Sequence, residues 1–247
     1  MRLAVVSDIH GNLPALEAVH RDLSGRGVDA VVNLGDSLSG PLLPRETAQF
    51  LMAQDWLSLA GNHERQLLTL GPEGRSPSDE HAHASLGAAE FAWLRSLPTT
   101  ARGPHGSFLC HGSPASDVEY LLETVEPSGR VRAATAAEVA TRVGSEEAGL
   151  ILCGHTHTPR VVRRDSGQLV VNPGSVGLPA YDDLLPWPHV IETGSPDARY
   201  CIVEFDPEKG WVVELLQVSY EHVAMAELAA RRGRPDWEIA LRTGSMR

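Results

Sequence analysis

Short apolar runs that each end in polar residues recur along the first part of the chain. The run at residues 3–7 predicts a buried strand, and the apolar positions Leu16, Val19 and Leu23 predict a helix that begins near Asn12. Further strands are predicted at residues 29–34, 56–60, 108–111 and 150–153, and further helices at residues 45–52 and 86–97. Strands that alternate with helices indicate an α/β fold with at least a partly parallel sheet.

Beyond residue 158 the pattern changes to β-rich runs joined by turns. These runs, at residues 160–164, 169–172, 200–205 and 211–218, predict a second and largely antiparallel sheet. Residues 71–84 lack periodicity and are predicted to form a loop, and residues 179–197, which contain four prolines, are predicted to form a long irregular loop. Residues 221–242 predict closing helices. Without a repeat or a clear boundary, we expect a single domain over residues 1–247.

Composition narrows the class of protein. Of the 247 residues, 42% are hydrophobic and 21% are charged, which is typical of a globular chain and excludes a disordered one. The net charge of -11 argues against bulk nucleic-acid binding, and no apolar run approaches the roughly 20 residues that cross a bilayer. Polar residues begin at Asp8, so the apolar run before it is too short for the core of a signal peptide. The three cysteines do not have the number or spacing of a disulfide framework. We therefore expect a cytoplasmic protein.

Five of the predicted strands end in side chains that can bind a metal ion. They are Asp8 with His10, Asp36, Asn62 with His63, His111, and His155 with His157. On an extended backbone, residues two apart project to the same side, so both members of a pair such as His155 and His157 can reach one ion. Imidazole mixed with carboxylate and amide oxygen suits divalent first-row metals. Because the set is too large for one ion, it predicts two ions about 3.5–4 Å apart, an arrangement suited to in-line displacement at phosphorus.

The order of these blocks resembles that of the calcineurin-like metallophosphoesterase superfamily. The blocks are Ser7-Asp8-Ile9-His10-Gly11-Asn12, Gly35-Asp36, Gly61-Asn62-His63-Glu64, His111-Gly112 and Gly154-His155-Thr156-His157. Together with Asn172-Pro173-Gly174-Ser175, they are most similar to the bacterial stand-alone phosphoesterases of that superfamily. The resemblance implies a four-layer α/β/β/α sandwich of two mixed sheets flanked by helices, with a dinuclear metal site at the carboxyl ends of the strands.

The resemblance also implies a role for each residue. One ion would be bound by Asp8, His10 and His157, the other by Asn62, His111 and His155, and Asp36 would bridge the two. The ions would be manganese in the first place, with iron, zinc, nickel or cobalt as alternatives. Water shared by two cations has a lowered pKa and becomes the nucleophile, and His63 would donate a proton to the leaving group. Asn62 would also stabilise the phosphoryl charge. Asn12 would cap a helix, contact the substrate phosphate, or do both.

The chain departs from the phosphoprotein-phosphatase branch after the bridging aspartate. That branch has an acidic residue and then an arginine three and four residues later, whereas this chain has Ser39 and Gly40. The partner that orients His63 is therefore not identified, and a serine/threonine phosphatase is disfavoured, although Glu64 resembles that branch.

Some residues have competing interpretations. Arg65 is expected in a surface ion pair rather than as a phosphate clamp. His81 and His83 are expected in a solvated loop or, as an alternative, on a substrate-facing rim. The Trp187 ring is expected to hold the long loop in place by packing, or to stack on a base or sugar.

The sequence therefore predicts a metal-dependent phosphoesterase that cleaves phosphodiester or phosphomonoester bonds of small, nucleotide-like substrates. Cyclic nucleotides are favoured, followed by dinucleoside polyphosphates and then phosphoproteins. The non-enzymatic alternative is a binding scaffold with this fold, but such proteins lose ligands, and none of the seven ligand positions is replaced here. Expected partners are a small phosphate ester and, as an open alternative, a second copy of the chain, with no bulk nucleic acid and no membrane.

Overall fold

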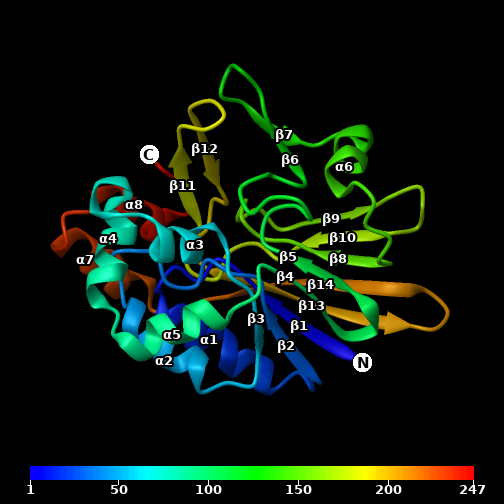
Figure 1. The fold of residues 1–247 in the computed structure, drawn as a ribbon, viewed down its shortest axis with the longest axis horizontal. Helices are drawn as coiled ribbons and strands as arrows, with labels where there is room; N and C mark the ends of the chain where they lie inside the picture. Colours follow the sequence, from blue (N-terminus) through cyan, green and yellow to red (C-terminus); the bar gives the residue numbers. More distant parts are fainter.

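Two five-stranded sheets lie face to face in the structure, a computed structural model that describes residues 1–247 (Figure 1). The first sheet has the strand order β14-β13-β1-β2-β3, in which β1, β2 and β3 are parallel and β13 and β14 are antiparallel to their neighbours. Its strands are β1 (Arg2–Val6), β2 (Ala30–Asn33), β3 (Leu57–Ser58), β13 (Ala198–Asp206) and β14 (Gly210–Val218).

The second sheet is also mixed and has the order β4-β5-β8-β10-β9. Strands β5, β8 and β10 are parallel, whereas β4 and β9 run antiparallel at the two edges. Its strands are β4 (Thr100–Arg102), β5 (Phe108–Cys110), β8 (Leu150–Leu152), β9 (Arg160–Arg163) and β10 (Leu169–Asn172). Two small hairpins lie outside the sheets, formed by β6 (Glu123–Val125) with β7 (Val131–Ala133) and by β11 (Ala180–Asp183) with β12 (His189–Glu192).

Helices cover the outer faces of the two sheets. Helix α1 packs on the first sheet and α6 on the second, while α7 and α8 pack against each other at the end of the chain. The helices are α1 (Leu13–Ser24), α2 (Pro44–Met52), α3 (Asn62–Thr69), α4 (Pro77–Ser85), α5 (Ala88–Ser96), α6 (Ala136–Val143), α7 (His222–Arg231) and α8 (Pro235–Thr243), with short 3₁₀ turns at η1 (Pro72–Gly74) and η2 (Pro104–Gly106). None of these helices has the length and apolarity needed to span a bilayer.

The alternation of side chains along the central strands explains the four layers. In β1, Leu3 and Val5 enter the core between the two sheets, whereas Ala4 and Val6 face α1. In β8, Leu150 and Leu152 enter the same central core, and Ile151 faces α6. Because both faces of each central strand are buried, these strands are continuous apolar runs in the sequence. The predicted four-layer sandwich of two mixed sheets is confirmed.

The predicted composition of the second sheet is wrong. The runs now seen as β13 and β14 join the first sheet, where Leu3 of β1 pairs with Val203 of β13. Only β9 and β10, of the four runs assigned to that sheet, belong to it. Apolar periodicity identifies a strand and its buried faces but carries no information about which distant strand becomes its neighbour.

The two segments predicted to be loops contain regular structure. Residues 71–84 include most of α4, which begins after Ser76, whose side chain accepts a hydrogen bond from the backbone of Asp79. Residues 179–197 contain the β11–β12 hairpin, in which Ala180 pairs with Glu192. Both segments are rich in polar residues or proline, so they lack the apolar periodicity that identifies a helix or a strand.

Candidate metal centre

The seven predicted metal ligands meet where strands of both sheets end. Six of the seven residues are buried, and His155 is partly exposed. The first sheet provides Asp8 and His10 after β1, Asp36 after β2 and Asn62 after β3, and the second provides His111 after β5 and His155 and His157 after β8. The carboxyl ends of parallel strands in two stacked sheets therefore form one polar cluster, as the sequence predicts.

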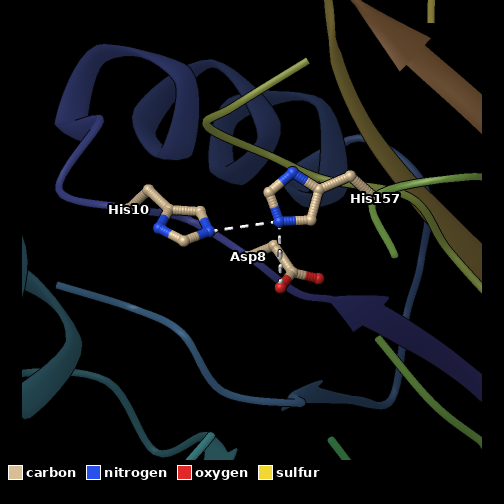
Figure 2. A group of neighbouring side chains, drawn as sticks. All are labelled: Asp8, His10 and His157. Carbon is tan, nitrogen blue, oxygen red and sulfur yellow. Dashed lines mark hydrogen bonds and ion pairs between the residues drawn. The ribbon is translucent and has the colours of Figure 1, made fainter. Parts of the chain in front are cut away.

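The ligand atoms form two groups. In one group Asp8, His10 and His157 each have a ligand atom within 4.8 Å of the others, and Figure 2 shows these three side chains converging. The second group consists of Asp36, His111 and His155 at the same spacing. The first group is the set that the resemblance assigns to one ion, and the second combines His111 and His155, which it assigns to the other ion, with Asp36, which it places between the two.

Contacts of His111 connect the two groups. Its Nε2 atom lies 3.0 Å from Asp36 Oδ2, 3.1 Å from Asn62 Oδ1 and 3.9 Å from Asp8 Oδ1. Asn62 is thereby placed with the second group. That Asp36 bridges two ions stays a prediction.

Hydrogen bonds to backbone carbonyls orient three histidines so that Nε2 faces the cluster. His10, His111 and His157 hold Nδ1 at 2.7, 2.9 and 2.7 Å from backbone carbonyl oxygens. A carbonyl only accepts, so Nδ1 donates and the lone pair of each neutral ring is on Nε2, which points into the cluster. The Nε2 atoms of His10 and His157 are only 3.2 Å apart, and Asp8 Oδ1 is buried without a hydrogen-bond partner. Facing lone pairs beside an unpaired carboxylate oxygen fit a bound cation.

The backbone at this cluster is in the left-handed region. Six non-glycine residues of the chain have positive φ, and five of them are predicted ligands. Those five are Asp8, His10, Asp36, His155 and His157, with φ between 52° and 69°. The argument that paired ligands share one side of an extended backbone is therefore wrong. The pairs converge because each chain turns sharply as it leaves its strand, a conformation that costs free energy and is typical of functional sites.

The surroundings in the cluster lower the pKa of some of its histidines and raise the pKa of another. Burial, with the neighbouring His157, lowers the pKa of His10 to about 4, and burial, with the neighbouring His111, lowers the pKa of His155 to about 3. Burial also disfavours the charged form of His111, but the Asp36 carboxylate outweighs it and raises the pKa of His111 to about 10. His10 and His155 are thus neutral at pH 7, and a metal ion would displace a proton from His111.

His63 lies beside the cluster and is paired with Asp79. Nδ1 of His63 donates to Asp79 Oδ1 at 2.8 Å, and Ser76 Oγ donates to Asp79 Oδ2 at 2.7 Å. Burial alone would lower the pKa of His63, but Asp36 and Asp79 outweigh it and raise this pKa to about 9. The residue that orients His63 is therefore Asp79, on α4. Sequence reasoning missed it because it assigned residues 71–84 to a loop, although Ser76-Pro77 followed by Asp79 is a helix-start signature that could have indicated it.

The structure also explains the departure at Ser39 and Gly40. The carboxylate expected at position 39 is provided from another element, by Asp79. No side chain fits at Gly40, because a Cβ there would lie 2.4 Å from the carbonyl oxygen of His10 and 2.8 Å from Cη2 of Trp237. Trp237 of α8 thus occupies the space that an arginine at position 40 would need.

Glu64 stabilises the loop that carries Asp36. Its buried carboxylate accepts hydrogen bonds from the backbone N–H groups of Asp36, Ser37 and Gly61 at 2.7, 2.9 and 2.9 Å. One side chain therefore joins the end of β2 to the start of α3, which fixes Asp36 relative to Asn62 and His63.

Asn12 has a structural role in this chain. The side chain is fully buried, its Oδ1 accepts a hydrogen bond from the backbone of Ala15, and its Nδ2 donates to the carbonyl of Gly177 and to the hydroxyl of Tyr220, both at 2.9 Å. Of the two predicted roles, the structure shows the helix cap. It leaves no polar atom of Asn12 without a partner, and Asn12 does not line the cavity described below.

The remaining candidates lie outside the site. Arg65 forms a surface ion pair with Asp117, with Nε 2.6 Å from Oδ2. His81 and His83 lie on α4 instead of in a loop, and neither lines the cavity. Trp187 lies between β11 and β12, is 46% exposed and does not line the cavity either.

A cavity of about 370 Å³ opens above the cluster. Its floor includes His10, Asp36 and Asn62, and its walls come from α3, α4, β11 and α8. His63 and Asp79 lie on the α3–α4 side of this cavity. A small molecule in the cavity would thus contact both groups of ligands and His63.

Comparison with known proteins identifies the family. Residues 1–184 match the model of the calcineurin-like phosphoesterase superfamily domain. The chain is 28% identical to an uncharacterized protein of Methanocaldococcus jannaschii, over 95% of this chain and 94% of that protein. It is similar to the crystal structure of a metallophosphoesterase from Sphaerobacter thermophilus, with a TM-score of 0.74, 27% identity and 99% of both chains covered. The fold is shared with a hypothetical protein from Pyrococcus horikoshii, with a TM-score of 0.74, 18% identity and 100% and 99% of the two chains covered. The chain belongs to the calcineurin-like phosphoesterase superfamily.

Proposed function

We propose that this protein is a metal-dependent hydrolase of phosphoric esters that acts on small phosphodiesters or phosphomonoesters. The observation that carries the proposal is the cluster of two ligand groups beside the His63–Asp79 pair in one cavity. Membership of the superfamily and the similarity to the metallophosphoesterase from Sphaerobacter thermophilus support the same class of reaction.

The proposed metal ligands are Asp8, His10 and His157 for one divalent ion and Asn62, His111 and His155 for a second, with Asp36 between them. When bound, the two ions would supply Lewis acidity and would lower the pKa of water enough to provide a hydroxide nucleophile near neutral pH. Manganese is the proposed ion at both sites, with iron, zinc, nickel or cobalt as alternatives, because mixed imidazole and oxygen donors suit divalent first-row metals as a group.

His63 is the proposed general acid. Its Nδ1 is held by Asp79, and its Nε2 has no hydrogen-bond partner within the chain. Without bound ions, the carboxylates of Asp36 and Asp79 outweigh burial and raise its pKa to about 9, and Asp79 stays hydrogen-bonded to the ring when Asp36 is occupied by metal. His63 can therefore donate the proton that an alkoxide leaving group needs.

The proposed substrates are small and nucleotide-like, with cyclic nucleotides favoured and dinucleoside polyphosphates as the alternative. A cavity of about 370 Å³ suits a molecule of that size. It is bounded by α4, β11 and α8, which disfavours a phosphoprotein as the substrate.

A substrate panel tests the proposal. Purified protein would be assayed with Mn²⁺, and in parallel with Zn²⁺, Ni²⁺ and Co²⁺, on cyclic nucleotides, dinucleoside polyphosphates, aryl monoesters and diesters, and a phosphopeptide. We expect hydrolysis of the aryl esters and of at least one nucleotide, and its loss in His111→Ala. If no ester is cleaved and metal analysis finds no bound ion, the protein is instead a binding scaffold.

A further inference from the structure

Arg234 is the one lysine or arginine that lines the cavity above the metal centre. It directly precedes α8, and its side chain connects α8 with α4. Nη1 donates to Ser78 Oγ at 2.7 Å, Nη2 donates to Asp236 Oδ2 at 2.6 Å, and Nε lies 3.0 Å from Asp236 Oδ1. With 19% of its side chain exposed, the guanidinium is fixed in place on two sides.

Two N–H groups of Arg234 have no partner in the chain. A guanidinium carries five N–H donors, and these contacts use one on Nε and one on each Nη. The remaining two, the second N–H of Nη1 and the second N–H of Nη2, are available to the oxygens of a phosphate or carboxylate. Asp236 fixes the plane of the guanidinium without using these two N–H groups.

The position of Arg234 relates it to the leaving group of a substrate. Ser78, which accepts from Arg234, directly precedes Asp79, which accepts from His63, so Arg234 and the proposed general acid lie on the same wall of the cavity. That wall is the side to which the leaving group would depart.

Trp237 separates Arg234 from the metal centre. Its ring centroid lies 6.1 Å from that of the proposed ligand His10, and the Cζ atom of Arg234 lies 5.6 Å from the Trp237 ring centroid. Arg234 is thus one aromatic ring further out than the metal ligands. It is placed to contact a part of the substrate beyond the phosphoryl group that the metal centre would hold.

We propose that Arg234 is a specificity-determining residue that binds an oxyanion on the leaving group. The preferred substrates are phosphodiesters or phosphoanhydrides whose leaving group itself carries one phosphate or carboxylate, such as a nucleoside monophosphate, which ranks dinucleotides of this kind above the cyclic nucleotides. Asp182 and Asp183, which line the cavity from β11 and form no ion pair with a cation, disfavour a longer polyphosphate chain. This inference rests on the proposed phosphoesterase function and narrows its substrate class.

Two dinucleotides that differ in their leaving groups test the inference. Hydrolysis of diadenosine 5′,5′-diphosphate adds water across the P–O–P bond and releases adenosine monophosphate, which carries a phosphate. Hydrolysis of adenylyl-(3′→5′)-adenosine releases adenosine, which carries none. The kcat/KM of each would be measured with Mn²⁺ for the wild type, Arg234→Gln and the matched control Arg65→Gln, whose arginine is paired with Asp117 outside the cavity.

We expect Arg234→Gln to lower kcat/KM for the diphosphate at least about tenfold, mainly through KM, because two charge-assisted hydrogen bonds are lost. The value for adenylyl-adenosine should not change, and Arg65→Gln should change neither. Arg234→Lys, which keeps the charge but loses these two fixed N–H donors, should give a smaller loss on the diphosphate alone. This second variant also decides the question if Arg234→Gln does not fold.

Equal losses on both dinucleotides, or no loss on either, would overturn the role of Arg234. So would a wild type that cleaves bis(4-nitrophenyl) phosphate but not the diphosphate. A wild type that cleaves none of the three would instead refute the proposed phosphoesterase function.

Discussion

Replacement of Asp79 by asparagine tests how the chain controls the proton of His63. The substitution keeps the size of the side chain but removes its charge, so the hydrogen bond from His63 Nδ1, 2.8 Å long, becomes a neutral one. The carboxylates of Asp36 and Asp79 together raise the pKa of His63 to about 9 against the effect of burial. Asp36 remains in the variant, so only the contribution of Asp79 is lost.

The size of the effect follows from that one contact. A hydrogen bond to a charged partner contributes about 1.5–3 kcal/mol, which corresponds to a fall of about 1–2 units in the pKa of His63. A general acid acts in its protonated form, so its contribution is present below its pKa and is lost as the pH rises through it. At a pH above both pKa values, a fall of about 1–2 units would reduce the protonated fraction of His63 about 10- to 100-fold.

The assay is the pH dependence of kcat between about pH 6 and 10 on an ester with an alkoxide leaving group and on a 4-nitrophenyl ester. We expect the alkaline limb for the alkoxide ester to move to lower pH in Asp79→Asn. The 4-nitrophenyl ester should be insensitive, because its leaving group needs no proton. Asp117→Asn, which removes a surface carboxylate paired with Arg65, is the matched control. An unchanged alkaline limb in Asp79→Asn, with the fold intact by thermal unfolding, would refute the reasoning.

Three further substitutions test the site. Asp36→Asn should reduce the occupancy of both ions, and metal analysis that finds two full sites in this variant would contradict a bridging role. His63→Ala should keep both metals but lose at least about 100-fold in turnover on esters with poor leaving groups, and unchanged turnover on them would exclude His63 as the acid. Gly40→Ala should lower the free energy of unfolding by about 1–3 kcal/mol, because its Cβ would collide with backbone and with Trp237. Gly25→Ala, where the nearest atom would be 3.7 Å away, is the control in denaturant titrations, and equal stability of the two variants would count against this packing argument.

The sequence predicts which residues cluster at the proposed metal centre better than it predicts what surrounds them. Asp8 and His10 can be recognised in the sequence as candidate site residues, because they directly follow an apolar run and this local pattern places them at the end of a strand. The pairing of β1 with β13 cannot be predicted from a local pattern, because Leu3 and Val203 are 200 positions apart and their contact depends on the whole fold.

The residues around the ligands show the same limit. Asp79 and Arg234 come from a polar helix and from the residue before α8, and neither is part of a block that the sequence alone makes recognisable. Their roles depend on two hydrogen bonds between different elements, from His63 on α3 to Asp79 on α4 and from Arg234 to Ser78, 156 positions earlier. The sequence signals a helix start at Ser76, but only the packing of α4 and α8 around the cavity shows that Asp79 contacts His63 and that Arg234 contacts Ser78.

The left-handed backbone at Asp8, His10, Asp36, His155 and His157 has a consequence for how the site responds to its ions. A left-handed backbone conformation costs each of these residues about 1–2 kcal/mol. The hydrogen bonds and packing of the two sheets must offset this cost when the chain folds. The ligands are then in position before any ion arrives, and binding does not have to reorganise the loops. We therefore expect the proposed ligand residues to keep these backbone conformations whichever divalent ion is bound.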